Sequence, residues 1–172
     1  MMKQKILAVS GVKNSGKTTL LEKMIPLLDG RGIRCAVIKH DGHVFDADRE
    51  GTDTARMLGA GAFGAAIFDG EKFQAVKRKT VSEQELIAMY PEADLILLEG
   101  FKYSAYPKLE IVRSKVSRSL SCDPGTLVAL VTDCEGIGPE GVPVFLPDDA
   151  EKIAAYVADW LLGEAAAQPR VW

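Results

Sequence analysis

Short apolar runs alternate with polar, glycine-containing segments along most of this chain. Five of the runs are rich in valine, isoleucine and leucine. Strands of a parallel sheet are covered on both faces, and such runs are therefore typical of parallel strands rather than of half-exposed ones. The predicted strands span residues 5–10, 33–38, 94–100, 108–113 and 126–132.

Longer segments carry apolar residues at helical spacing, which predicts amphipathic helices between the strands. The first covers residues 17–28 and contains Pro26, which we expect to kink it. The last begins at residues 147–149 and continues to Leu162, where Gly163 ends it.

Local signals predict two short helices and a hairpin. Thr52 is a suitable cap for a helix over residues 53–58, and Ser82 with Glu85 forms a capping-box pattern that opens a helix to Tyr90. Between these helices, residues 65–68 and 72–76 flank Asp69-Gly70, a pair that favours a type I′ turn in a β-hairpin.

Strands separated by helices indicate the α/β class, with a mostly parallel sheet flanked by helices and a β-hairpin insertion. We find no internal repeat and no linker in the sequence. We therefore expect one domain over residues 1–162, followed by a tail over residues 163–172.

Composition narrows the functional classes. The 172 residues are 47% hydrophobic and 26% charged, with a formal net charge of −3, so no basic surface for nucleic acid is indicated. No apolar stretch reaches the roughly 18 to 20 residues that cross a bilayer. The 3 cysteines include no CxxC pair, which favours a reducing, cytoplasmic compartment.

The strongest motif is a phosphate-binding loop, Gly11-x-x-x-x-Gly16-Lys17-Thr18, between the first strand and the first helix. In such a loop the glycines allow close approach, and backbone amides at a helix N-terminus converge on phosphate oxygens. Lys17 would reach the β- and γ-phosphates, and the Thr18 hydroxyl would bind Mg²⁺. The motif predicts a nucleotide-binding P-loop NTPase fold.

A carboxylate for the metal is expected on a neighbouring strand. The segment "DLILLEG" delivers Glu99 at the carboxyl end of a buried strand, the edge where open α/β sheets bind their ligands. We therefore predict that Glu99 lies near the metal or its water.

The segment "KHDGHVFDAD", over residues 39–48, is the second cluster of polar residues. Its acidic residues, Asp46 among them, are candidates for outer-shell contacts to the metal. His40 and His43, three residues apart, also allow a zinc site. No cysteine or third histidine lies nearby, which favours structural hydrogen bonding or contact with a phosphate instead.

Asp133 ends a later strand, where a nucleotide base would lie. A carboxylate that accepts from two guanine nitrogens would select GTP over ATP. The alternative is an ordinary aspartate in a turn.

Together these segments resemble the MobB family of molybdopterin-guanine dinucleotide biosynthesis adapter proteins. The phosphate loop fits many families, whereas two further groups of residues are more particular. They are Lys39, His40, His43, Asp46, Asp48, Gly51, Asp53 and Thr54, and then Glu99, Gly100, Phe101 and Lys102. The chain has Gly42 where the family often has a second histidine.

The resemblance implies a GTP-binding protein of the SIMIBI type, usually a homodimer. Such a protein assists the guanylyltransferase that joins GMP to molybdopterin and has weak GTPase activity. The resemblance also places Glu99 as the strand-end acid and Asp133 as the residue that contacts the base. It implies that the phosphates and Mg²⁺ bind to Gly11, Asn14, Ser15, Gly16, Lys17, Thr18 and Thr19.

Two other functions remain open from the residues. A small-molecule kinase using ATP or GTP would need a lid with several arginines, and the stretch after Glu99 has only the scattered Arg113 and Arg118. A nickel or zinc metallochaperone GTPase would use His40 and His43. The aromatic and basic segment 99–113 is either a docking or dimer surface, which would receive a protein or an anionic pterin, or an exposed loop.

Overall fold

The computed structural model describes residues 4–42 and 48–163. Backbone contacts divide them into two compact units. One unit holds the described residues up to His40 and from Ile87 onward, and the other is Asp41–Leu86.

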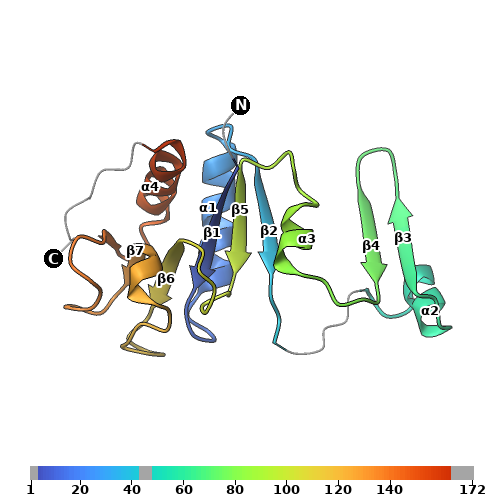
Figure 1. Cartoon of the computed structure of the whole chain (residues 1–172), viewed down its shortest axis with the longest axis horizontal. Helices are drawn as coiled ribbons and strands as arrows, with labels where there is room; N and C mark the ends of the chain where they lie inside the picture. The colour runs from blue at the N-terminus through green and yellow to red at the C-terminus, as the bar shows by residue number, and fades with distance from the viewer. Residues whose placement is uncertain (1–3, 43–47, 164–172) are drawn as a thin grey trace. The chain divides into compact units, whose positions relative to one another are not determined.

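The first unit is built on a six-stranded sheet in the order β2-β5-β1-β6-β7-β8 (Figure 1). Every adjacent pair is parallel, which confirms the predicted fold class. The carboxyl ends of the strands therefore share one edge. The strands are β1 (Lys5–Ser10), β2 (Cys35–Lys39), β5 (Leu95–Glu99), β6 (Lys108–Val112), β7 (Leu127–Thr132) and β8 (Val144–Phe145).

The continuous apolar runs occupy the interior of this sheet. All residues of β5 are buried, and so are the last four of β1. Burial on both faces explains why these strands show no alternation of polar and apolar residues. The second strand begins at Cys35, two residues later than the pattern predicts.

Two long helices cover one face of the sheet. The helices α1 (Lys17–Asp29) and α4 (Ala150–Leu162) pack against each other, and their apolar residues join those of the strands in one core cluster (Figure 1). The helix α1 continues through Pro26 to Asp29. As predicted, Gly163 ends α4, and it does so in the left-handed conformation, at φ 79°.

On the opposite face, loops rather than long helices cover β6, β7 and β8. Buried Val112, Leu130 and Val144 form a small cluster there with Cys134. Partly buried residues of the intervening loops, Leu120, Ile137 and Val142, pack against it.

The second unit contains α2 (Asp53–Gly59) and an antiparallel hairpin of β3 (Gly64–Phe68) and β4 (Phe73–Lys77). The Thr52 hydroxyl accepts from the Ala55 amide at 3.3 Å, so the predicted cap is confirmed.

The hairpin turn differs from the prediction. Neither Asp69 nor Gly70 has a positive φ, which a type I′ turn requires at both central residues. Instead, the Asp69 carboxylate accepts from the amides of Glu71 and Lys72, at 2.8 and 2.9 Å, within a four-residue connection between Phe68 and Phe73.

The capping box before α3 (Glu83–Ile87) is confirmed. The Ser82 hydroxyl accepts from the Glu85 amide at 3.2 Å, and the Glu85 carboxylate accepts from the Ser82 amide at 2.9 Å. The helix ends three residues before the predicted Tyr90.

Among the described residues, no helix is long and apolar enough to cross a membrane.

Candidate functional site

The loop between β1 and α1 has the backbone of a tight anion cradle. Three of its residues have positive φ: Gly11 at 140°, Asn14 at 63° and Gly16 at 97°. A Cβ at Gly11 would lie 2.5 Å from the Ile111 carbonyl oxygen and 2.6 Å from Ser15 Oγ. The loop therefore needs glycine at this position for space as well as for conformation.

The loop leads directly into the N-terminus of α1. Gly16 is the N-cap and provides no side-chain acceptor for the first-turn amides. Amides at this end of a helix carry partial positive charge and favour anions. Asn14 and Thr19 are exposed beside them, while Ser15 is buried and its hydroxyl has no hydrogen-bond partner.

Lys17 folds back over the loop that precedes it. Its ammonium donates to the carbonyl oxygens of Gly11 at 3.1 Å and Val12 at 2.8 Å. Burial lowers the pKa of Lys17, the Glu99 charge raises it, and the charges of Lys39 and Lys102 lower it further. The ammonium is thus held at the loop by oxygen acceptors and can exchange them for phosphate oxygens.

Thr18 and Glu99 come together at the same edge. In the sheet register Glu99 lies opposite Val9, just before the loop, and its side chain is only 9% exposed. The Thr18 hydroxyl donates to Glu99 Oε1 at 2.8 Å. The structure therefore joins the predicted metal-binding hydroxyl and the predicted strand-end acid.

This pair of oxygen groups suits Mg²⁺. A hydroxyl that donates its proton to a carboxylate keeps its lone pairs for a cation, and carboxylate and hydroxyl oxygens are hard donors that Mg²⁺ prefers. The other predicted metal residue, Asp46, lies outside the described residues, as does His43.

Two further residues of this edge were given no part in the metal site by the sequence. Lys39 Nζ lies 3.5 Å from Glu99 Oε1, the oxygen that also accepts from Thr18. Phe101 has a φ of 49°, unusual for a bulky residue, and its ring lies edge-on to that of His40 at 5.7 Å. A lysine at the end of a strand beside an acidic strand end is the signal that would have identified Lys39.

Asp133 is separated from β1 by the whole of β6. Its Oδ1 accepts from the Ser114 amide at 2.6 Å, and its Oδ2 lies 3.4 Å from Arg113 Nε. The Ser114 amide, more than the Arg113 charge, holds the pKa of this carboxyl below its usual range. Both oxygens are therefore engaged with neighbouring residues of the chain.

Asp48 and His40 have local contacts. The Asp48 carboxylate accepts from the Thr54 hydroxyl and from the Arg49 amide, and the Thr54 hydroxyl is the main reason that its pKa is lowered. No group of three or more potential metal ligands occurs among the described residues.

A buried polar cluster lies on β6, within the segment 99–113 that the sequence suggested as a docking surface or an exposed loop; for Lys108 that expectation is wrong. Lys108 and Glu110 are both fully buried. The Lys108 ammonium donates to the carbonyl oxygens of Ser104 and Tyr106, whereas Glu110 accepts from Ser121 and from the Cys122 thiol, the latter at 2.8 Å. Burial and the Glu110 contact raise the pKa of Cys122 to about 12, which disfavours its thiolate form. Charged residues at alternate positions of an apolar strand were the available signal.

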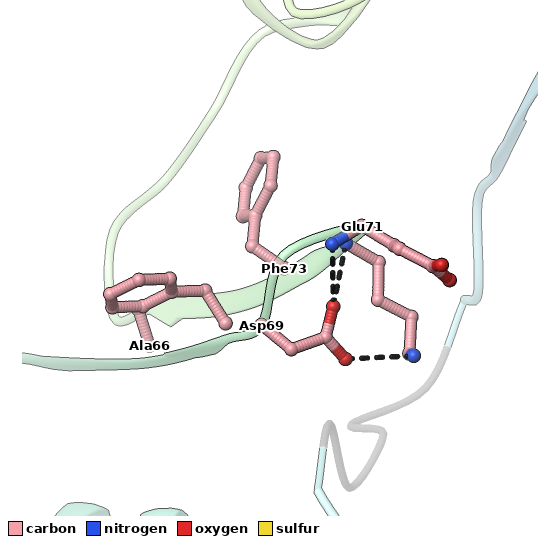
Figure 2. Close-up of a pocket in the computed structure, with 6 residues that line it drawn as sticks. Ala66, Asp69, Glu71 and Phe73 are labelled. Carbon is pink, nitrogen blue, oxygen red and sulfur yellow. Dashed lines mark hydrogen bonds and ion pairs between the residues drawn. The ribbon is translucent and has the colours of Figure 1, made fainter.

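Figure 2 shows a pocket in the second unit, beside the turn of the hairpin of β3 and β4. Asp69 binds the amides of Glu71 and Lys72 there and pairs with the Lys72 ammonium at 2.9 Å. These contacts close the turn and offer no arrangement for catalysis. The lining residues are Ala66, Phe68, Asp69, Glu71, Lys72 and Phe73.

Comparisons with known proteins match this chain to one family. The family described as MobB, molybdopterin guanine dinucleotide synthesis protein B, matches residues 6–133. A molybdopterin-guanine dinucleotide biosynthesis adapter protein from Haemophilus influenzae is 39% identical over 67% of each chain. The protein of the same name from Escherichia coli is 33% identical over 91% of this chain and 93% of its own.

A solved structure shows the same fold. The crystal structure of Bacillus subtilis MobB superimposes with a TM-score of 0.73 at 27% identity, over 95% of this chain and 99% of that one. Family match, sequence identity and fold agree with the resemblance predicted from the motifs, and the chain belongs to the MobB family of molybdopterin guanine dinucleotide synthesis proteins.

Proposed function

We propose that this chain is a GTP-binding adapter in molybdopterin guanine dinucleotide biosynthesis, where it assists the guanylyltransferase that joins GMP to molybdopterin. The observation that carries the nucleotide-binding part is the 2.8 Å hydrogen bond from Thr18 to Glu99 beside the phosphate loop. The adapter part rests on the names of the relatives, which cover the chain almost end to end.

The phosphates are held by the loop and by the first turn of α1. The backbone at Gly11, Asn14 and Gly16 turns the loop around the anion, and the amides of α1 face it. Lys17 exchanges its two carbonyl acceptors for phosphate oxygens. Because charged acceptors form stronger hydrogen bonds than carbonyl oxygens, this exchange favours the bound nucleotide.

Thr18 and Glu99 would hold Mg²⁺, with Asp46 as the further residue that the sequence predicts. When bound, the ion supplies positive charge to the β- and γ-phosphate oxygens. Glu99 orients the Thr18 hydroxyl through their hydrogen bond, so the hydroxyl oxygen points its lone pairs away from the carboxylate.

Hydrolysis by this arrangement is slow at most. A rapid GTPase needs an arginine at the transferred phosphate, which is worth roughly 10³ to 10⁵ in rate. Arg113 Nε lies 3.4 Å from the Asp133 carboxylate, which leaves Arg118 or an arginine of a partner for this role. We therefore assign GTP mainly to binding, with a weak Mg²⁺-dependent GTPase activity.

The guanine preference, the homodimer and the cytoplasmic location are parts of the same proposal and rest on the resemblance. Asp133 is the proposed guanine reader. To accept from guanine it would share oxygens that already accept from Ser114 and pair with Arg113. Molybdopterin is a further ligand to test.

A nucleotide-binding titration tests the proposal. The titration uses a fluorescent GTP analogue and Mg²⁺. We expect Lys17→Ala to weaken binding of this analogue at least tenfold without loss of the fold, because the Lys17 ammonium lies at the phosphate loop. Lys13→Ala is the matched control, since Lys13 is an exposed lysine of the same loop. Unchanged affinity in folded Lys17→Ala would contradict the proposal.

Two assays on the same protein distinguish the adapter function from that of a small-molecule kinase. Binding of the guanylyltransferase that depends on GTP and Mg²⁺ supports the adapter. Steady phosphorylation of an added metabolite would support the small-molecule kinase instead.

A further inference from the structure

One oxygen of the Glu99 carboxylate contacts two other side chains. Oε1 accepts from the Thr18 hydroxyl at 2.8 Å and lies 3.5 Å from the Lys39 ammonium. The carboxylate is 9% exposed, whereas the Lys39 side chain is 55% exposed. A nearly buried anion is thus paired with a cation that retains access to solvent.

The sheet itself produces this contact. The strand β2 is at the edge of the sheet and pairs in parallel with β5, so that Lys39 lies directly opposite Glu99. On the other side of β5, Glu99 lies opposite Val9 of β1, which leads into the phosphate loop. Three neighbouring strand ends therefore bring the lysine, the carboxylate and the loop to one place.

A divalent cation held by Thr18 and Glu99 would compete with Lys39. Two cations near one carboxylate oxygen repel each other, and the cation with the greater charge is favoured when the phosphates supply its other ligands. The Thr18 hydrogen bond can persist, because it uses the hydroxyl proton and not its lone pairs. Only the lysine must move, and its exposed side chain allows that movement.

We infer that the Lys39 ammonium is the counter-ion of the Glu99 carboxylate in the absence of metal, and that Mg²⁺ displaces it when the metal and the nucleotide bind. This inference rests on the proposed nucleotide and Mg²⁺ site. Binding of Mg²⁺ must break the contact between Lys39 and Glu99. The contact therefore raises the Mg²⁺ concentration at which the site is half-saturated.

The test is a Mg²⁺ titration of fluorescent GTP-analogue binding at fixed protein and nucleotide concentrations. We expect Lys39→Met to lower the Mg²⁺ concentration at half-saturation about two- to fivefold, the size of effect given by removing one partly exposed ion pair. Lys39→Arg should restore the wild-type value, since it keeps the charge.

Two further variants separate this contact from a general effect of charge. Lys102→Met removes an equal charge whose field also reaches Lys17, but for which the structure shows a contact with the Tyr103 ring instead. We expect its effect on half-saturation to be less than twofold. In a Glu99→Gln background, Lys39→Met should have no effect, because the charged partner is gone.

The outcomes distinguish the two proposals. Normal nucleotide binding with an unchanged half-saturation in Lys39→Met overturns this inference alone, and so does an equal shift in Lys39→Met and Lys102→Met. Failure of the wild-type protein to bind the GTP analogue overturns the proposed function and this inference with it. Circular dichroism of each variant confirms that the fold is kept.

Discussion

At the scale of single residues, the site depends on backbone positions that exclude a side chain. Gly11 combines a φ of 140° with a Cβ position 2.5 Å from the Ile111 carbonyl oxygen. The neighbouring Ile111 belongs to β6, so the close approach is between the phosphate loop and the adjacent strand. The glycine is needed for the fold of the sheet edge as well as for access of a phosphate.

We therefore expect Gly11→Ala to lower the free energy of unfolding by about 2 to 4 kcal/mol, the range for a strained and overpacked position. Gly32→Ala is the matched control, because Gly32 also has a positive φ, 76°, but nothing within 4 Å of an added Cβ. It should cost only about 1 to 2 kcal/mol. Urea denaturation measures both, and equal losses would show that the contact with Ile111 does not matter.

At the scale of elements, one face of β6 is apolar, and the other carries two buried charges beside Val112. Leu109 and Ile111 belong to the core beneath α1 and α4, whereas Lys108 and Glu110 are buried under loops on the other face. The buried charges hold two loops against the strand: Lys108 binds the carbonyl oxygens of the loop after β5, and Glu110 binds donors of residues 121 and 122. The loop after β5 is the one that follows Glu99.

Replacing the Glu110 carboxylate should therefore be costly. In Glu110→Gln, the amide nitrogen replaces one of the two carboxylate oxygens, so it must face either the Ser121 donors at Oε1 or the Cys122 donors at Oε2. We expect a loss of about 1 to 3 kcal/mol in the free energy of unfolding, the cost of buried polar groups without acceptors. Exposed Glu140→Gln should change it by less than about 0.5 kcal/mol. Similar values for the two variants, from urea denaturation, would contradict this role for Glu110.

At the scale of the whole molecule, the sequence predicted what local patterns control. Continuous apolar runs located the central strands, and the phosphate-loop motif located the edge of the sheet at which the candidate site lies. Glu99 was expected beside the loop because parallel strands end at one edge, and the structure places it in contact with Thr18. The hairpin turn was mispredicted because the Asp69 side chain, rather than positive φ values, organises it.

Features that depend on distant parts of the chain were not predictable in this way. The burial of Lys108 and Glu110 depends on loops whose positions the fold sets. The contact of Lys39 with Glu99 needs the order of the strands, which brings β2 beside β5 across more than fifty residues of sequence. Asp133 was expected at a base, and only the register of β6 and β7 shows that Arg113 and Ser114 already contact it.

The two units should also differ in local stability. The sheet of the first unit has six strands, and β1 and β5 each have a hydrogen-bonded neighbour on both sides and a buried run of residues. The hairpin of the second unit is a two-stranded sheet in which most residues are exposed, Phe68 and Phe73 among them. Two-stranded hairpins are only marginally stable in water, and local opening is easiest where few apolar groups are buried.

Hydrogen–deuterium exchange followed by mass spectrometry measures this difference. We expect peptides from β1 and β5 to exchange only through global unfolding, with protection that falls steeply as urea is added. Peptides from β3 and β4 should exchange at least tenfold faster, with little dependence on urea, because a local opening exposes little surface. Equal protection in the two units would mean that the aromatic face of the hairpin is covered by contacts beyond those within its own unit.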